Sequence, residues 1–312
     1  MIEVKNLTFE YPDKAALNDV SFNIEPNTIT ALVGPNGSGK TTLLRCLAAL
    51  AKPGSGDIWI HGFHTGKQPQ EVHKHTGFLQ DLFGLYDALT VYQCLQFMAY
   101  SMIGEKMEVR PAFDRVVHLT GIEDFLDKKV GHLSRGMRQK VGIAAAVIHQ
   151  PPVLFLDEPA SGLDPEARHD LSNLLVTLRK EGMTIMVSSH ILAELADYST
   201  DMLVIQGGRM VENKKLVTQP ALAGHYVLLE VGADDSLETH QESIRHLSGV
   251  NGIKEINGKI HVHLDLQMTS KHQFLNTLIS NGFKINDFTE VKINLQDEYI
   301  KTVQQFKENN RK

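Results

Sequence analysis

The chain has 312 residues, of which 42% are hydrophobic and 22% charged, values typical of a globular protein large enough for two domains rather than of a disordered or fibrous chain. No apolar run approaches the roughly 18 residues expected of a membrane span, and the N-terminus lacks the basic region and apolar core of a secretory signal, so we expect a cytoplasmic protein. The net charge of −6 lies in residues 1–212, and neither part of the chain has the basic stripe of a nucleic-acid-binding protein.

Two strands are expected at the N-terminus, Ile2–Phe9 and Leu17–Ile24, joined by a turn around Tyr11. They should form an antiparallel part of the fold. A short apolar strand over residues 29–33 leads into the glycine-rich sequence Gly-Pro-Asn-Gly-Ser-Gly-Lys-Thr at residues 34–41. The apolar periodicity of residues 41–50 then predicts a helix.

A strand, a glycine-rich loop and a helix in this order are typical of a nucleotide-phosphate cradle. Gly34, Gly37 and Gly39 let the backbone curl so that successive N–H groups point inward. Lys40 should then reach the outer phosphates, and the Thr41 hydroxyl can bind Mg²⁺. The loop therefore predicts a bound nucleotide.

Residues 82 to about 142 are predicted to be largely helical and to interrupt a parallel core between Gln80 and Asp157. Within them, Ser134 is well placed to cap a helix, and Gly136 in the first turn leaves the backbone open to close approach. A helix N-terminus with a free hydroxyl is an anion site, but a simple capped helix also explains this segment. By itself the segment leaves both interpretations open.

Residues 153–156 are apolar and are followed by Asp157 and Glu158. The run predicts a strand buried on both faces, as in a parallel sheet. The two acids would then lie at the carboxyl end of the strand, where open α/β sheets bind ligands. Asp157 can orient Mg²⁺, and Glu158 can polarise an attacking water.

The first domain is expected to close with two further strand signals. An apolar strand over residues 184–187 precedes His190, and two short strands flank Gly207 and Gly208, a hairpin signal. We therefore place the first domain at residues 1–212 and a linker at 213–225.

Residues 226–312 change pattern and carry no catalytic motif that we identify. The elements follow the order β-α-β-β-α-β, which predicts a small α+β, ferredoxin-like domain. Asn257 and Gly258 predict a hairpin turn, and an amphipathic segment over residues 295–306 predicts a C-terminal helix. The expected strands are 226–231, 252–256, 259–264 and 284–291, and the expected helices are 237–247 and 271–279.

The cysteines and histidines give weaker signals. Cys46 and Cys94 lie far apart in predicted helices and are expected in the core. A histidine group at residues 61–75 and the pair at 261 and 263 allow two interpretations, metal binding or local hydrogen bonding. Metal sites need a complete set of three or four ligands, so we favour hydrogen bonding.

Taken in order, these motifs resemble those of the ATP-binding subunit of an ABC transporter. Residues 34–41 are similar to the family's Walker A loop, 153–158 to its Walker B strand, and 133–139 to its signature sequence. Residues 161–164 resemble the loop that crosses the dimer interface. The resemblance covers residues 1 to about 212. It implies an α/β P-loop NTPase fold with a mixed sheet, an antiparallel β subdomain and a helical insertion.

The resemblance also assigns roles to single residues. It makes Glu158 the base, His190 the contact of the γ-phosphate, and Gln80 a contact of Mg²⁺ and of the membrane partner. It implies that Tyr11 stacks on adenine. The metal ligands would be Thr41, Gln80 and Asp157, and ATP would also be held by Gly34, Asn36, Gly37, Ser38, Gly39, Lys40, Thr41, Thr42, Ser134, Gly136 and Asp164.

Two departures from the common pattern bear on function. Arg135 and Met137 stand where many family members have glycine and glutamine, which resembles ATPases paired with export permeases. Asp87 replaces a frequent proline in the insertion that docks the membrane partner. The resemblance implies ATP-driven export through a separate integral membrane permease, at the inner face of the membrane and with a second, identical ATPase subunit. The alternative is a soluble ABC ATPase that acts on nucleic acid or ribosomes.

Overall fold

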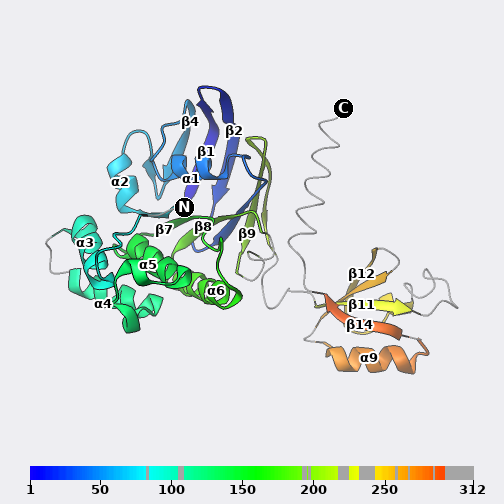
Figure 1. Cartoon of the computed structure of the whole chain (residues 1–312). Coiled ribbons are helices and arrows are strands. Elements are labelled where there is room, and N and C mark those ends of the chain that lie inside the picture. Colours follow the sequence, from blue (N-terminus) through cyan, green and yellow to red (C-terminus); the bar gives the residue numbers. More distant parts are fainter. Residues whose placement is uncertain are drawn as a thin grey trace. The chain divides into compact units, whose positions relative to one another are not determined.

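The computed structural model describes residues 1–81, 84–104, 109–191, 195, 198–216, 225–231, 243–256, 259–265, 268–283 and 285–291. Internal contacts divide the chain into two compact units, one of residues 1–216 and one within residues 217–297 (Figure 1). Each unit is described by itself. No described helix is long and apolar enough to cross a membrane.

The first unit contains a four-stranded antiparallel sheet. Its order is β2-β1-β4-β5, with β1 at Ile2–Tyr11, β2 at Lys14–Ile24, β4 at Ser55–Ile60 and β5 at Phe63–His64. The predicted antiparallel pair is thus confirmed, and both strands reach further into the turn than expected. Residue Tyr11 of β1 lies directly opposite Lys14 of β2, which leaves only two residues in the turn.

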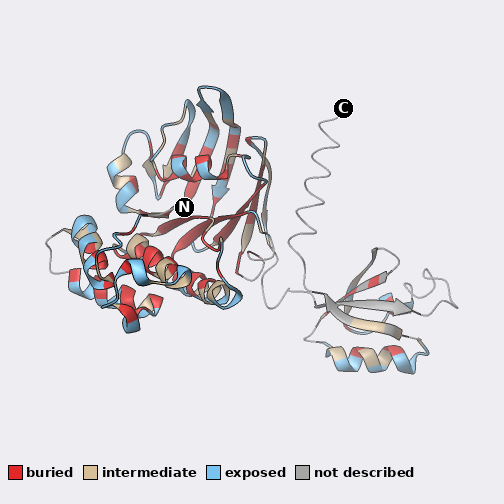
Figure 2. Ribbon diagram, in the orientation of Figure 1, coloured by how far each residue is buried: buried red, intermediate tan, exposed pale blue. Residues whose placement is uncertain are grey.

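A six-stranded mixed sheet forms the second layer of this unit, as predicted. Its order is β10-β9-β3-β8-β7-β6, and every neighbouring pair is parallel except β10 with β9. The strand bounds are Thr76–Leu79 for β6, Val153–Asp157 for β7, Thr184–Ser189 for β8, Ile29–Val33 for β3, Asp201–Gln206 for β9 and Arg209–Lys215 for β10. Every residue of β3, β7 and β8 is buried (Figure 2).

Helices complete the unit, and the predicted helical insertion is confirmed over its described residues. The insertion contains α3, α4, two short 3₁₀ turns and most of α5, which ends at Val147 rather than near residue 142. The bounds are Lys40–Leu47 for α1, Pro69–Lys74 for α2, Val91–Ile103 for α3, Val109–Thr120 for α4, Glu123–Phe125 and Val130–His132 for the turns, Arg135–Val147 for α5 and Pro165–Lys180 for α6.

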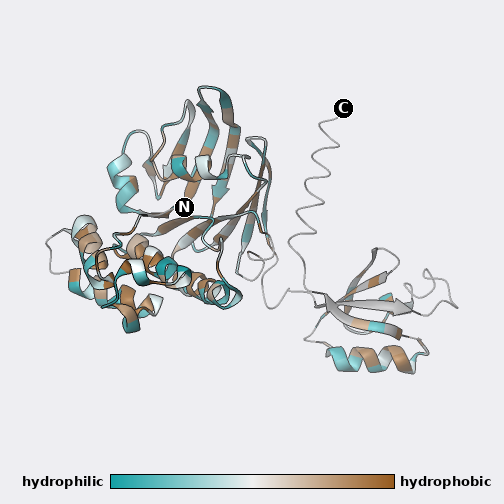
Figure 3. Cartoon of the chain, viewed as in Figure 1, coloured by the Kyte–Doolittle hydropathy of each residue, from teal (hydrophilic) through white to brown (hydrophobic). Residues whose placement is uncertain are grey.

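Helix α1 is shorter than the predicted segment 41–50. Ala49 adopts a left-handed conformation with φ of 55°, which a continuing α-helix does not allow. The helix nevertheless lies on the core, and its buried face contains Cys46, as expected. One apolar cluster joins side chains of α1 with both sheets, and Figure 3 shows apolar residues (brown) along the strands.

The end of the first unit differs from the predicted limit at residue 212. The hairpin turn at Gly207 and Gly208 is present, but β10 stays paired with β9 as far as Lys215. The Leu216 amide then donates to the Thr200 carbonyl at 2.7 Å. The strand continues because these backbone groups find partners, so the first unit extends to residue 216.

The second unit contains a four-stranded antiparallel sheet of order β12-β13-β11-β14. Its first strand therefore lies between the last strand and β13, and α9 connects β13 to β14, which fits the predicted ferredoxin-like order. The predicted turn at Asn257 and the helix at 295–306 lie outside the described residues, as does most of the helix at 237–247. The bounds are His225–Val231 for β11, Val250–Ile256 for β12, Lys259–Leu264 for β13, Lys271–Ser280 for α9 and Ile285–Val291 for β14.

Candidate active site

The glycine-rich loop lies between buried strand β3 and the start of α1. Gly37 and Gly39 have φ values of 75° and 109°, a region that favours glycine. A Cβ atom on Gly39 would lie 2.6 Å from the Ala16 carbonyl oxygen, so no side chain fits there. The Lys40 side chain is only 7% exposed, and its Nζ donates to the Gly34 carbonyl at 2.8 Å. The loop is therefore a closed turn with an ammonium group inside it.

The two predicted acids lie at the carboxyl end of β7, where Asp157 is the last residue of the strand and Glu158 follows it. Asp157 is buried, and its Oδ1 accepts a hydrogen bond of 2.6 Å from the Ser188 hydroxyl. The same hydroxyl oxygen accepts the Glu158 amide at 3.0 Å. Ser188 is in register with Asp157 on neighbouring strand β8. This serine therefore fixes both acids, and the motifs did not identify it.

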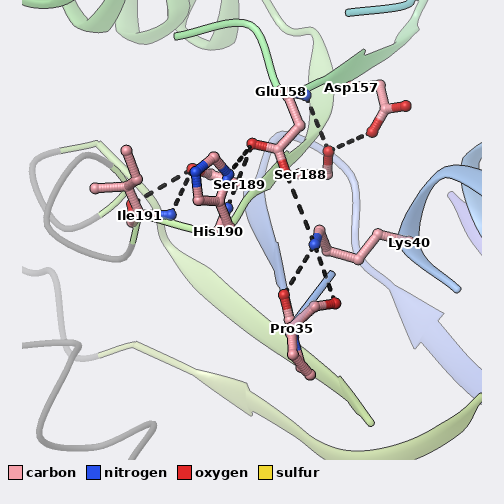
Figure 4. A network of polar contacts seen from close by, with 9 residues as sticks. Pro35, Lys40, Asp157, Glu158, Ser188, Ser189, His190 and Ile191 are labelled. Atoms are coloured by element: carbon pink, nitrogen blue, oxygen red, sulfur yellow. Dashed lines mark hydrogen bonds and ion pairs between the residues drawn. The ribbon is translucent and has the colours of Figure 1, made fainter. Parts of the chain in front are cut away.

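Glu158 contacts both a lysine and a histidine (Figure 4). Its Oε1 lies 3.6 Å from Lys40 Nζ, and its Oε2 lies 2.7 Å from His190 Nδ1. The Glu158 side chain is 17% exposed, whereas His190 is 46% exposed and lies toward solvent. A carboxylate held between an ammonium and an imidazole can take a proton from a water molecule in the same cavity.

A cavity of about 340 Å³ extends from this group to an aromatic side chain. Tyr11 is 46% exposed, and its hydroxyl lies 3.4 Å from Thr42 Oγ1. An aromatic face at one end and a phosphate loop at the other suit a nucleotide, and the volume is in the usual range for small-molecule sites. The lining residues are Tyr11, Lys14, Ala16, Asn36, Gly37, Gly39, Lys40, Thr41, Thr42 and Glu158.

The structure also brings the predicted magnesium ligands to one edge of the sheet. Leu79 of β6 pairs with Leu156 of β7, so Gln80, directly after β6, and Asp157, the last residue of β7, lie at the same end of neighbouring strands. Thr41 lines the cavity from the start of α1. A hydroxyl, a carboxylate and an amide oxygen are hard oxygen donors of the kind that Mg²⁺ prefers. The donor set therefore fits this ion.

Five predicted ATP contacts are absent from the described cavity lining. Gly34 and Ser38 belong to the glycine-rich loop itself, whereas Ser134, Gly136 and Asp164 lie outside the loop. The Ser134 hydroxyl caps α5 by accepting the Met137 amide at 3.2 Å. Asp164 caps α6 in the same way. Within one chain, the visible role of both side chains is therefore helix capping.

Arg135 of the signature segment packs against the loop between β7 and α6. Gly162 has φ of 65°, and a Cβ atom there would run into the guanidinium group of Arg135. Arg135 thus lies against the Gly162 backbone. Helices α5 and α6 are also joined by an ion pair of 2.7 Å between Lys140 and Asp170.

Comparison with known proteins agrees with this geometry. Residues 17–161 match the model of the ABC transporter family. The ATP-binding protein NatA of Bacillus subtilis is 35% identical over 68% of this chain and 88% of its own length. The bacitracin transport ATP-binding protein BcrA of Bacillus licheniformis is 30% identical over 97% of both chains. This chain belongs to the ABC transporter family.

A solved structure gives the same result for the fold. The ATP-binding cassette MJ0796, in a dimeric post-hydrolysis state with ADP and Pi, is 26% identical with a TM-score of 0.64; the match covers 69% of this chain and 99% of that one. The ABC ATPase fold of the first unit is thus confirmed. As a member of this family, the chain is an ATPase, the ATP-binding and hydrolysing subunit of an ABC transporter, and such subunits work with membrane permeases.

Proposed function

We propose that this ABC ATPase drives the export of a substrate through a separate membrane permease, at the cytoplasmic face of the membrane. The observation that carries the proposal is the cavity in which Tyr11, Lys40 and Glu158 meet. The relative named for bacitracin transport, which matches this chain over 97% of both lengths, supports a role in transport. Support for export comes from the SkfA peptide export ATP-binding protein SkfE of Bacillus subtilis, which is 34% identical over 68% of this chain. The Arg135 and Met137 pattern in the signature segment supports the same direction.

Hydrolysis follows from the contacts of Glu158. A water oxygen attacks the γ-phosphorus of ATP, the bond to the leaving ADP oxygen breaks, and the water proton passes to Glu158. Lys40 and His190 stabilise the charge that develops on the phosphate oxygens. Thr41, Gln80 and Asp157 would hold Mg²⁺, which neutralises phosphate charge when it is bound.

We further propose that two copies of this chain complete the site. The cavity in one chain does not include Ser134, Gly136 or Asp164 among its described lining residues. A second copy placed head to tail would bring the N-terminus of α5, with the Ser134 hydroxyl, to the phosphates. The dimeric state of MJ0796 with ADP and Pi supports this arrangement.

The permease contact is proposed at α3, in the helical insertion. Tyr86, Phe97 and Tyr100 are 55%, 52% and 49% exposed, and the Tyr86 and Phe97 rings touch edge to face with centroids 5.8 Å apart. Exposed aromatic clusters of this kind are typical of protein interfaces. Gln80 precedes this segment in the chain. We therefore propose that the segment couples conformational changes at the ATP site to the permease.

Purification in detergent from the native cell tests the function. We expect an integral membrane protein to be recovered with the tagged chain, and Phe97→Asp to release it. Leu50→Asp, a change at another exposed apolar side chain (46%), is the matched control and should not release it. Recovery of ribosomes or DNA without any membrane protein would favour the soluble alternative and contradict the proposal.

A further inference from the structure

The β1–β2 hairpin forms the wall of the cavity opposite the phosphate loop. Tyr11 and Lys14 are directly opposite each other in this antiparallel pair, so their side chains lie on the same face of the sheet. Both residues line the cavity, and so does Ala16, two positions further along β2. The hairpin therefore presents an aromatic ring and an ammonium group to the same ligand.

Lys14 lies close to the phosphate loop itself. Its Nζ is 4.0 Å from the position that a Cβ atom on Gly37 would occupy. Gly37 has no side chain and has φ of 75°, so the ammonium lies over bare backbone. A nucleotide phosphate held by the loop would then have Lys14 on its hairpin side.

The Lys14 ammonium forms no ion pair or hydrogen bond with another side chain or backbone group in the part of the chain that the structure describes. The nearby acid Glu10 pairs with Ala15, one position from Lys14, and therefore lies on the other face of the sheet. Lys40 differs, because the Gly34 carbonyl and Glu158 both contact its ammonium group. Lys14 thus contributes a positive charge that the protein does not neutralise there.

We propose that Lys14 is a further phosphate-binding residue, which contacts the phosphate chain of ATP from the hairpin side. The charged residues that line the described cavity are Lys14, Lys40 and Glu158. ATP brings several negative charges, and Lys40 already shares its charge with Glu158. A second ammonium group favours the polyphosphate by charge-assisted hydrogen bonding. The assignment rests on the proposed place of the nucleotide in this cavity.

The test is a charge series at position 14 in the full chain. We expect Lys14→Met to raise the Kd for ATP about three- to tenfold, a typical size for one partly screened charge contact. The KM should rise by the same factor while kcat stays within about twofold, because Lys14 binds the ground and transition states alike. Lys14→Arg should keep the wild-type affinity, and added salt should reduce the loss in Lys14→Met.

Affinity is measured by displacement of a fluorescent ATP analogue with unlabelled ATP. The control is Lys5→Met, an exposed lysine of β1 that pairs with Glu3 outside the cavity. A loss below twofold in Lys14→Met, or an equal loss in Lys5→Met or Lys14→Arg, would overturn the assignment. Lys40→Ala tests the nucleotide site separately from the role of Lys14. If Lys40→Ala also leaves the affinity for ATP unchanged, the proposed nucleotide site is wrong. If only Lys40→Ala weakens binding, the site is right and the role proposed for Lys14 is wrong.

Discussion

Glu158 has a strained backbone at the point where the reaction is proposed to occur. Its φ of 50° is unusual for a residue with a side chain, and such strain is retained only where neighbouring groups enforce it. The enforcing group is Ser188, whose hydroxyl accepts the Glu158 amide and donates to Asp157. The position of the base is therefore set from a neighbouring strand.

We expect Ser188→Ala to lower kcat and stability together. The change removes the hydroxyl donor to the buried Asp157 carboxylate, which costs about 1–3 kcal/mol of unfolding free energy. The Glu158 amide keeps only the Ser188 carbonyl, at 3.2 Å, as acceptor. Misplacement of Glu158 should lower kcat by about tenfold or more. Urea unfolding and steady-state ATPase assays measure the two effects. Ser172→Ala, which removes a hydroxyl within α6, is the control. Wild-type kcat in Ser188→Ala would show that the bridge does not position the base.

The motifs predicted Lys40, Asp157 and Glu158 because each belongs to a short, contiguous pattern. They did not predict Ser188, because its role depends on the register of β8 against β7. The motifs did not predict Lys14 either, because its position opposite Tyr11 depends on where the hairpin turns. Short-range patterns thus identify side chains, whereas sheet pairing decides which of them meet.

Ser134, the N-cap of helix α5, has two possible roles. Ser134 caps the helix in the single chain, and the proposed dimer also places it at the phosphate of the second copy. The structure shows the first role only. A substitution that keeps the cap and changes the charge separates them.

Ser134→Asp is that substitution. Aspartate is as good an N-cap as serine, so the free energy of unfolding should stay within about 0.5 kcal/mol of wild type. A carboxylate next to the ATP phosphates should repel them, and ATPase activity should fall by at least about tenfold. Asp164, the cap of α6, shows that an aspartate fits such a position in this chain. A stable Ser134→Asp protein with wild-type activity would mean that Ser134 is only a cap.

His149, two residues after the last residue of α5, contacts β6. His149 Nε2 donates to the Thr76 carbonyl at 3.2 Å, and its Nδ1 is buried with no hydrogen-bond partner among the described residues. Burial lowers the pKa of His149 below its ordinary value; the hydrogen bond to Thr76 opposes this effect and nearby His75 adds to it. The folded state therefore binds fewer protons than the unfolded chain, and stability is lost as pH falls below about 6.5.

We expect His149→Gln to reduce this pH dependence. Glutamine can donate to the Thr76 carbonyl but does not titrate, so unfolding free energy should vary less between about pH 7 and 5.5. Denaturant unfolding at several pH values measures the slope. His73→Gln, at an exposed side chain of α2, is the matched control. An unchanged slope in His149→Gln would assign the pH dependence to other groups.

In the first unit, the sequence predicted which segments are helices and which are strands more accurately than it predicted where each one ends. Helix α1 stops early at Ala49, and β10 runs on to Lys215, because backbone conformation and pairing decide where an element ends. The sheet orders also needed the structure, since periodicity does not say which strands are neighbours. In the second unit, the predicted strands are present and pair in a ferredoxin-like order.

The described cavity belongs to the first of the two units. Every described residue that lines the cavity belongs to residues 1–216. For the second unit we propose one of two roles, a sensor or dimer clamp that regulates the ATPase or a purely structural domain that stabilises the dimer. Its small apolar cluster around Phe274 gives it a core of its own.

A chain that ends at Leu216 should therefore keep its affinity for ATP within about threefold, since it retains the described residues that line the cavity. Displacement of a fluorescent ATP analogue measures this, and circular dichroism shows whether the shortened chain is folded. A folded but non-binding chain would place part of the site in residues 217–312. Comparing its ATPase rate and dimer mass with those of the full chain separates the sensor from the dimer-stabilising domain.

In the proposed mechanism, ATP holds two copies of the chain together and Glu158 then drives hydrolysis. Both steps are tested by the mass and the ATP turnover of Glu158→Gln in one sample with ATP, beside the wild type and Glu71→Gln as control. We expect a turnover lower by about 100-fold or more, with ATP still bound and the mass doubled. Turnover at the wild-type rate, or a mass that stays monomeric with ATP bound, would contradict this mechanism.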